Sequence, residues 1–161
     1  MSEAEIRRAQ ATDVAAITRL RREWVHERTG EREDPAFDGR LADWFAQESG
    51  RRIIWLAEIG GRPVGMMNLA VFERMPQPGQ AHGRWGYLGN AFVLPEYRNR
   101  GIGTQLLNVV LGYADGNGFV RVVLSPSSAS IPFYSRVGFG PASSLMLRTP
   151  PRATVTDGSR D

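Results

Sequence analysis

Three stretches of the sequence repeat apolar residues at three- and four-residue spacings, the period of a helix that buries one face. The clearest stretch spans residues 100–115, where the repeating positions are Ile102, Leu106, Val109, Val110 and Tyr113. Another begins near Thr12, a residue suited to cap a helix, and repeats at Ile17, Leu20, Trp24 and Val25. The remaining one repeats at Phe37, Leu41, Trp44 and Phe45. We therefore expect three amphipathic helices, two early in the chain and one late.

Short apolar runs bounded by turn residues predict strands between these helices. The expected strands are Glu5 to Ala9, Ile53 to Ile59, Pro63 to Phe72, Trp85 to Leu94 and Val120 to Leu124. Gly60-Gly61 joins two of them as an antiparallel hairpin. After the last of these strands we expect a short helix over residues 129–136, and a final strand or hairpin over residues 139–147. The pattern alone predicts a mixed α/β domain.

Length and composition fit one folded domain. The 161 residues leave no room for a second domain, and contents of 42% hydrophobic and 23% charged residues are ordinary for a folded protein. We expect the domain to span residues 1–148. Residues 149–161 include two prolines and no apolar cluster, so they are expected to form a flexible tail. The sequence has no apolar run of membrane-spanning length and no signal peptide pattern, so we expect no membrane partner and a cytoplasmic location.

The absence of two residue types excludes several chemistries. The chain has no cysteine, which rules out disulfides, thiolate metal sites and a cysteine nucleophile. All twenty basic residues are arginine, which rules out a Schiff-base lysine. His26 and His82 are far apart in the sequence, so no metal is expected. The net charge is only +3 and the arginines are scattered among acidic residues, so no nucleic-acid partner is expected.

The stretch from Val93 to Thr104 carries the strongest candidate chemistry. An apolar strand ends at Pro95 and a helix begins near Arg100 or Gly101, so the chain must turn abruptly between them. The start of a helix leaves about four backbone N–H groups unpaired and carries partial positive charge, which favours anions. Glycines let the backbone approach a phosphate, while Arg98 and Arg100 add forked cationic donors. The bend fits a phosphate group, although glycines and arginines at such a turn also occur without a ligand.

Two segments together resemble one known superfamily. The dinucleotide fingerprint and the P-loop do not fit, because Leu106 stands where the first needs a third glycine and the chain has no lysine for the second. Arg98-x-x-Gly101-x-Gly103, preceded by Val93-x-Pro95-x-Tyr97, instead resembles the acetyl-CoA diphosphate motif of the GNAT superfamily of N-acyltransferases. The segment from Ser127 through Pro132-Phe133-Tyr134 to Gly138-Phe139 is similar to the C-terminal signature of that superfamily.

The resemblance implies an α+β fold with a central, mixed but mostly antiparallel sheet flanked by helices. It implies direct transfer of an acetyl group from acetyl-CoA to an amine. Tyr134 would lie near the coenzyme sulfur and act as the acid that protonates the departing thiolate. The backbone N–H groups of Phe92 and Val93 would polarise the thioester carbonyl, on a strand where Gly89 and Asn90 predict an irregularity.

The remaining expected cofactor-binding positions follow the two motifs. They are Arg98, Asn99, Arg100, Gly101, Ile102, Gly103, Thr104, Ser127 and Ser130. Many superfamily members have asparagine and alanine where this chain has the two serines. Serine still hydrogen-bonds, but it does not reproduce the contacts of an asparagine amide.

The general base is left open. Many superfamily members have a glutamate on the strand before the bend, and the segment from Trp85 to Phe92 contains none. The alternatives are Glu27, Glu73, His82, and a water chain through Tyr87 and Asn90.

The acceptor is left open as well. Acidic residues between the first two expected helices lie where the resemblance places the acceptor site; they are Glu27, Glu31, Glu33, Asp34 and Asp38. They could attract a cationic amine, although charge runs of this kind usually face water. We expect a small amine as acceptor and allow for a homodimer. The alternatives are acetylation of a protein amino terminus or lysine, and a non-catalytic domain that binds acyl-CoA as a sensor.

Overall fold

The computed structural model describes residues 3–151. The backbone contacts of the chain define two compact units, residues 1–125 and 126–161. The single domain expected over residues 1–148 stays a prediction. The tail expected over residues 149–161 falls almost wholly outside the described residues, and residues 149–151 have no regular structure.

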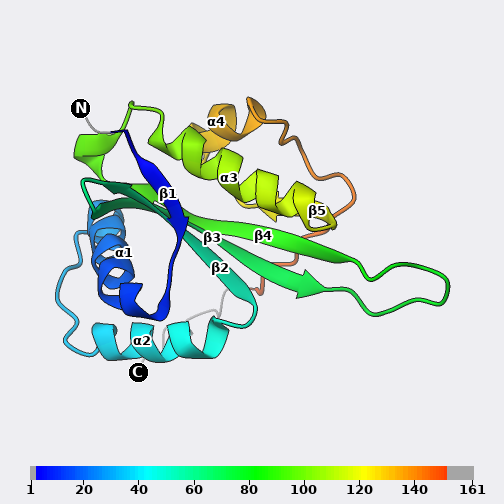
Figure 1. Cartoon of the computed structure of the whole chain (residues 1–161), viewed down its shortest axis with the longest axis horizontal. Coiled ribbons are helices and arrows are strands. Elements are labelled where there is room, and N and C mark those ends of the chain that lie inside the picture. Colours follow the sequence, from blue (N-terminus) through cyan, green and yellow to red (C-terminus); the bar gives the residue numbers. More distant parts are fainter. Residues whose placement is uncertain (1–2, 152–161) are drawn as a thin grey trace, which may run out of the picture. The chain divides into compact units, whose positions relative to one another are not determined.

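The first unit is built on a five-stranded sheet whose strands lie in chain order (Figure 1). The strands are β1 (Glu5–Arg8), β2 (Arg52–Ile59), β3 (Arg62–Glu73), β4 (Arg84–Val93) and β5 (Phe119–Leu124). All neighbours pair antiparallel except β4 and β5, which pair parallel. The parallel pair requires a crossover, which the third helix of the unit supplies. The expected α+β class and the hairpin of β2 and β3 are confirmed.

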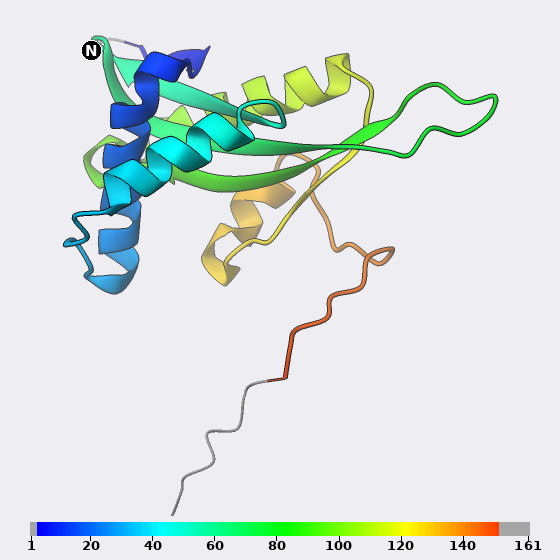
Figure 2. The same cartoon turned by 90° about the horizontal axis from the view of Figure 1, so that it is seen from below.

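Three helices cover the two faces of this sheet: α1 (Val14–Thr29), α2 (Phe37–Glu48) and α3 (Ile102–Gly116). Alternate residues of a strand point to opposite faces. On β3, a Cβ on Gly65 would lie 3.4 Å from the Leu106 side chain of α3. Its neighbour Met66 lines a pocket together with residues of α1 and α2. Helices α1 and α2 therefore lie on one face and α3 on the other (Figures 1 and 2).

Burial on both faces makes β3 the centre of the core. The strand is buried without interruption from Val64 to Ala70. The largest fully buried side chains of the unit are Leu20, Leu56, Val64, Met67, Leu69, Leu106, Leu107 and Val110. Burial of apolar area is the main favourable contribution to folding, so the pairing of α3 with β3 is central to the stability of this unit.

The start of the first helical stretch differs slightly from the prediction. A 3₁₀ turn, η1 (Ala11–Asp13), precedes α1, and Asp13 rather than Thr12 makes the capping bond by accepting the Gln10 N–H at 2.7 Å. Asp13 also accepts two bonds of 2.8 Å from Arg7, which reaches Glu58 at 2.6 Å as well. The aspartate satisfies more donors than a threonine hydroxyl can, and it joins β1, η1 and β2.

The second unit contains a 3₁₀ turn, η3 (Ser128–Ser130), followed by α4 (Ile131–Ser135). The short helix expected over residues 129–136 is confirmed. The strand or hairpin expected over residues 139–147 is wrong, because residues 126–151 contain no strand. Gly138, Gly140 and Pro141 interrupt the backbone pattern. Met146 is fully exposed and Leu147 is 92% exposed, so the short apolar run has no buried face to hold it in a sheet.

Truncation of a core residue of α3 tests the packing of this helix on β3. Leu106→Ala is expected to lower the free energy of unfolding by about 2–5 kcal/mol, since a fully buried leucine is replaced by a cavity. The matched control is Val109→Ala on the same helix, whose side chain is 40% exposed and should cost far less. Urea unfolding followed by circular dichroism measures both. Equal losses in the two variants would contradict the packing described.

Candidate functional site

Strand β4 is irregular near its centre. In its ladder with β3, β4 advances three residues, from Gly89 to Phe92, while β3 moves two, from Asn68 to Met66. The extra residue makes a β-bulge. Within it Asn90 has a left-handed φ of +53°, which asparagine tolerates better than most residues. The irregularity predicted from Gly89 and Asn90 is confirmed.

The two halves of β4 have different neighbours. The first half, from Arg84 to Leu88, pairs with β5. The second half, from Gly89 to Val93, has no pairing on that side among the described residues. The Leu94 N–H donates to Val64 O at 2.9 Å, and successive residues of a strand point their polar groups to opposite edges. The backbone N–H of Val93 therefore faces the unpaired edge, while the backbone N–H of Phe92 faces β3.

Beyond Val93 the chain turns into α3 through the predicted bend. The bend consists of a 3₁₀ turn, η2 (Pro95–Tyr97), and two left-handed residues, Asn99 (φ +59°) and Gly101 (φ +79°). Gln105 N–H donates to Gly101 O at 2.9 Å and closes the first turn of the helix. The N–H groups of residues 102–104 precede this bond, so they have no intrahelical acceptor. The bend therefore presents backbone donors at the positive end of the helix.

The two arginines of the bend differ in how far they are engaged. Arg98 donates from both terminal nitrogens to the carboxylate of Glu27 on α1, at 2.7 and 2.6 Å, and from Nε to Val93 O at 2.9 Å. This pairing lowers the pKa of Glu27 below its ordinary value. Arg100 is exposed and makes one bond, from Nη2 to Glu96 O at 2.9 Å. Three of the five N–H donors of Arg98 are therefore in use, against one of Arg100.

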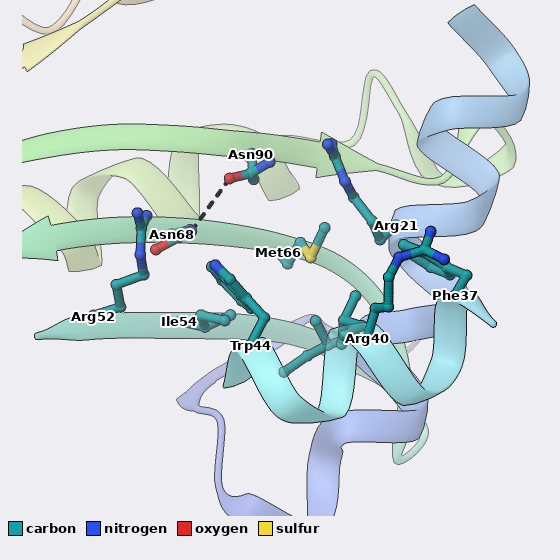
Figure 3. Close-up of a pocket in the computed structure, with 11 residues that line it drawn as sticks. Arg21, Phe37, Arg40, Trp44, Arg52, Ile54, Met66, Asn68 and Asn90 are labelled. Carbon is teal, nitrogen blue, oxygen red and sulfur yellow. Dashed lines mark hydrogen bonds between the residues drawn. The ribbon is translucent and has the colours of Figure 1, made fainter. Parts of the chain in front are cut away.

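A pocket of about 350 Å³ lies on the sheet face that α1 and α2 cover (Figure 3). Its apolar lining includes Ile17, Phe37, Leu41, Trp44, Ile54 and Met66, and its polar lining consists of Arg21, Arg40, Arg52, Asn68 and Asn90. Asn68 Nδ2 donates to Asn90 Oδ1 at 3.2 Å. Because Asn90 belongs to the bulge, the pocket reaches β4 where this strand parts from β5.

The predicted residues of the second unit lie close to one another. Ser127 Oγ donates to Ser130 Oγ at 3.0 Å, and Ser130 Oγ donates to Ser127 O at 2.9 Å. Tyr134 packs edge-on against the rings of Phe133 and Phe139, with centroids 5.0 and 5.7 Å away. Burial raises the pKa of Tyr134 above its ordinary value, which already lies well above neutral pH, so the phenol is protonated.

The structure narrows the open question of the general base. The carboxylate of Glu27 is held by Arg98, which makes it a weak proton acceptor. Glu73 contacts the His82 ring at 2.5 Å, but it lies five residues beyond Asn68 along β3, about 17 Å at the usual rise of a strand. Tyr87 is 40% exposed on β4, opposite Ala70 and thus on the same face as Asn68.

Residues 17–139, which include the bend and the whole of the second motif, match the model of the Acetyltransferase (GNAT) family. The chain belongs to this family. Members of the GNAT family use acetyl-CoA as the acyl donor. The resemblance read from Arg98 to Gly103 and from Ser127 to Phe139 is therefore confirmed at the level of the family.

Individual relatives and solved structures agree with membership of the GNAT family. The glucosamine 6-phosphate N-acetyltransferase of Trypanosoma brucei brucei is 32% identical over 79 residues, which are 49% of this chain and 52% of that protein. The chain thus aligns with about half the length of this curated relative. A GCN5-related N-acetyltransferase from Ralstonia eutropha JMP134 is 27% identical with a TM-score of 0.70, covering 91% of this chain and 99% of that one. A predicted acetyltransferase from Clostridium acetobutylicum, solved with acetyl-CoA, has the same fold at 21% identity, a TM-score of 0.74 and coverages of 91% and 96%.

Of the polar residues that line the pocket in this GNAT protein, sequence reasoning named Asn90 and missed Arg21, Arg40, Arg52 and Asn68. Arg21 stands four residues after Ile17, a spacing that places both on one helix face and could have signalled its position. Arg52 and Asn68 carry no comparable signal, because they meet only through the register of β2 and β3. Within residues 3–151 no group of three or more acidic or histidine side chains could hold a metal ion, and no helix has the length and apolarity to cross a membrane.

The ion pair between Glu27 and Arg98 makes stability depend on pH. Because Arg98 lowers the pKa of Glu27 from 4.5, the pair stabilises the fold above about pH 4.5, and its contribution is lost as the pH falls through the lowered pKa. Glu27→Gln is expected to reduce the free energy of unfolding at pH 7 by less than about 1 kcal/mol, since both side chains are about two-fifths exposed.

The measurement is urea unfolding of wild type and Glu27→Gln between pH 7 and pH 3. The difference between the two proteins should shrink as the pH falls from about 4.5 through the lowered pKa of Glu27, because the carboxyl then becomes protonated in wild type. Asp43→Asn, an exposed change on α2, serves as the control. A difference that stays constant over this range would show that the carboxylate is not what stabilises the contact.

Proposed function

We propose that this chain transfers an acetyl group from acetyl-CoA to the primary amine of a small molecule, by direct attack within a complex of both substrates. The observation that carries the proposal is the dual use of β4. One side of its second half offers the unpaired edge and the bend into α3, and its bulge residue Asn90 lines a pocket. Donor and acceptor can thus approach the same short segment of one strand.

On the donor side, the backbone supplies most of the proposed contacts. The N–H groups of residues 102–104 bind the diphosphate of the coenzyme, and the left-handed Asn99 and Gly101 bring the chain into position. Arg100 adds charge. Arg98 is held by Glu27, so we assign it mainly to positioning the bend. Val93 N–H, on the unpaired edge, is favoured over Phe92 as the donor that polarises the thioester carbonyl.

The second unit contributes the proposed acid. Acetyl-CoA supplies the acetyl thioester and leaves as a thiolate, which must take up a proton. Tyr134 matches the family signature, and its phenol carries a proton at neutral pH that it could give to the thiolate. In this structure the hydroxyl groups of Ser127 and Ser130 bond to each other. We therefore propose them as coenzyme contacts only because they match the family signature.

On the acceptor side, polar amides take the place of a carboxylate. None of the described residues that line the pocket is aspartate or glutamate. We propose that Asn68 and Asn90 orient the amine and that water carries its proton away, passing Tyr87 on the same sheet face. Only the uncharged form of the amine has a lone pair for attack, and free alkylamines with a pKa of ~10 are mostly protonated at neutral pH.

The size of the pocket favours a small acceptor over a protein. A volume of about 350 Å³ is at the lower end for small-molecule sites. The lining of the pocket comes from two helices and three strands, whereas an extended peptide is commonly bound along a strand edge or a long groove. The named activity of the trypanosomal relative, on an amino sugar phosphate, is also that of a small-molecule acetyltransferase.

The test combines binding and turnover. Calorimetry with acetyl-CoA alone checks donor binding, and release of free coenzyme A thiol is then followed with panels of small amines and of peptides. Turnover with small amines supports the proposal. Turnover with peptides only would replace it by protein acetylation. Tight acetyl-CoA binding without turnover would favour a sensor.

Removal of the phenol tests the proposed acid. Tyr134→Phe is expected to lower kcat about 100-fold, a typical loss for a general acid, while the Kd of acetyl-CoA stays within twofold. Tyr113→Phe, a phenol of α3 that packs on Trp55, is the control and should retain full kcat. Thiol release and calorimetry measure the two quantities. An unchanged kcat for Tyr134→Phe would remove this residue from the acid role.

Neutralising Arg100 tests the diphosphate site. Arg100→Gln is expected to raise the Kd of acetyl-CoA about tenfold, because a charge-assisted bond to phosphate is lost. Binding of S-acetylpantetheine, which lacks the diphosphate, should not change. Arg121→Gln is a matched control, since Arg121 also stacks on an aromatic ring but lies on β5. Equal weakening of both ligands would argue against the assignment.

A further inference from the structure

The pocket on the α1 and α2 face is cationic. Three of its lining side chains are guanidinium groups, those of Arg21, Arg40 and Arg52, and none of the described lining residues is acidic. This differs from the alternative in which acidic residues near the first two helices attract a cationic amine. Of those residues, Asp34 and Asp38 are already paired with arginines, at 2.5 Å in each case.

Two of the three arginines have carboxylate partners outside the pocket lining. Arg40 Nη2 contacts Asp34 at 2.5 Å. Arg52 Nε contacts Glu48 at 2.6 Å, and Arg51 also binds that carboxylate, so the pKa of Glu48 falls to about 2. Their charges are largely balanced before any ligand arrives.

Arg21 lacks such a balance. Its Nη1 is buried and has no hydrogen-bond partner among residues 3–151. The guanidinium lies on the face of Trp24, 4.1 Å from the ring centroid, and Arg28 approaches the same ring at 5.2 Å. Burial, and then the nearby Arg28, lower the pKa of Arg21, yet a guanidinium stays charged at neutral pH. An incompletely solvated cation beside a second cation is costly, and an anion at Nη1 would offset the cost.

The strand side of the pocket offers the complementary group for an amine. Asn68 is 3% exposed, and its Oδ1 is buried without a hydrogen-bond partner among the described residues. In the view of Figure 3, Met66 lies between Asn68 and Arg21, and the ring of Trp44 faces the strands. Asn68, on the strand side of the pocket, can therefore accept an N–H. Arg21, on the helix side, can donate to an anion, and the apolar surface of Met66 lies between them.

We propose that the acceptor is an amine that also carries an anionic group, a phosphate monoester or a carboxylate, and that Arg21 binds this group while Asn68 accepts an N–H of the amine. The inference rests on the proposed acetyltransferase function and adds the substrate class. The anion fixes the far end of the acceptor and places its amine at the bulge of β4. Arg21 is then the residue that determines specificity.

Matched pairs of acceptors test the substrate class. Glucosamine 6-phosphate is compared with glucosamine, and 4-aminobutyrate with its amide, by release of coenzyme A thiol. Wild type is expected to have a kcat/KM at least tenfold higher for the anionic member of one pair, and which pair responds distinguishes phosphate from carboxylate. No preference for the anionic member in either pair would overturn the proposal.

Variants of α1 test the residue. Arg21→Gln is expected to raise the KM of the preferred anionic acceptor about 10- to 100-fold, the loss typical of a charged hydrogen bond. The KM of acetyl-CoA and the kcat/KM of the neutral partner should stay within twofold. Arg28→Gln is the matched control, because Arg28 stacks on the same tryptophan without lining the pocket. Arg21→Lys should recover part of the effect; equal losses for charged and neutral acceptors would assign Arg21 a structural role instead.

A binding measurement separates this inference from the proposed function. Glucose 6-phosphate and 4-hydroxybutyrate carry the anions but no amine, so quenching of tryptophan fluorescence reports their binding without turnover. Wild type should bind one of them at least tenfold more tightly than glucose or 4-hydroxybutyramide, and Arg21→Gln should not. Anion binding without thiol release from any amine would refute the acetyltransferase function and leave the anion site standing. Turnover of neutral amines only, with no anion binding, would refute the anion site and leave the acetyltransferase function standing.

Discussion

The separation of β4 from β5 is the constraint on which the other features of the first unit depend. A strand inside a sheet normally uses its N–H and C=O groups on both edges, and the second half of β4 has lost one neighbour. The bulge at Asn90 accompanies this change by adding a residue and bending the strand. As a result the Val93 N–H has no strand partner among residues 3–151, while Asn90 lines the pocket. One local irregularity thus leaves an unpaired strand edge and also contributes a residue to the pocket lining.

Ion pairs determine which of the arginines near β4 remain without a carboxylate partner. Glu27 holds Arg98 and thereby ties α1 to the bend before α3. Asp34 and Glu48 balance two of the pocket arginines. Exposed pairs add little stability, but they orient side chains and cancel charge. Arg21 also lines the pocket, and its buried Nη1 has no hydrogen-bond partner among the described residues, so its charge is left without a balancing carboxylate.

Much of the fold was predictable because it depends on short-range pattern. The periodicity of residues 100–115 predicted α3 to within two residues, and Gly60-Gly61 predicted the turn between β2 and β3. The error at residues 139–147 has the same origin. Leu145, Met146 and Leu147 look like a strand in a pattern, yet a strand needs hydrogen-bonded neighbours and a buried face, which residues 126–151 do not provide for them.

By itself the sequence determined the local structure of the bend before α3 and the family of the chain. Its order of proline, arginine and glycine dictates a local turn and a helix start, and local backbone geometry needs no distant partner. Only the tertiary structure decided what lines the pocket. Arg21, Arg52 and Asn68 come from three elements, and their meeting depends on strand register and helix packing, which are long-range properties. The same holds for the ion pair between Arg98 and Glu27. Glu27 lies 71 positions earlier in the chain, so no local pattern predicts the contact.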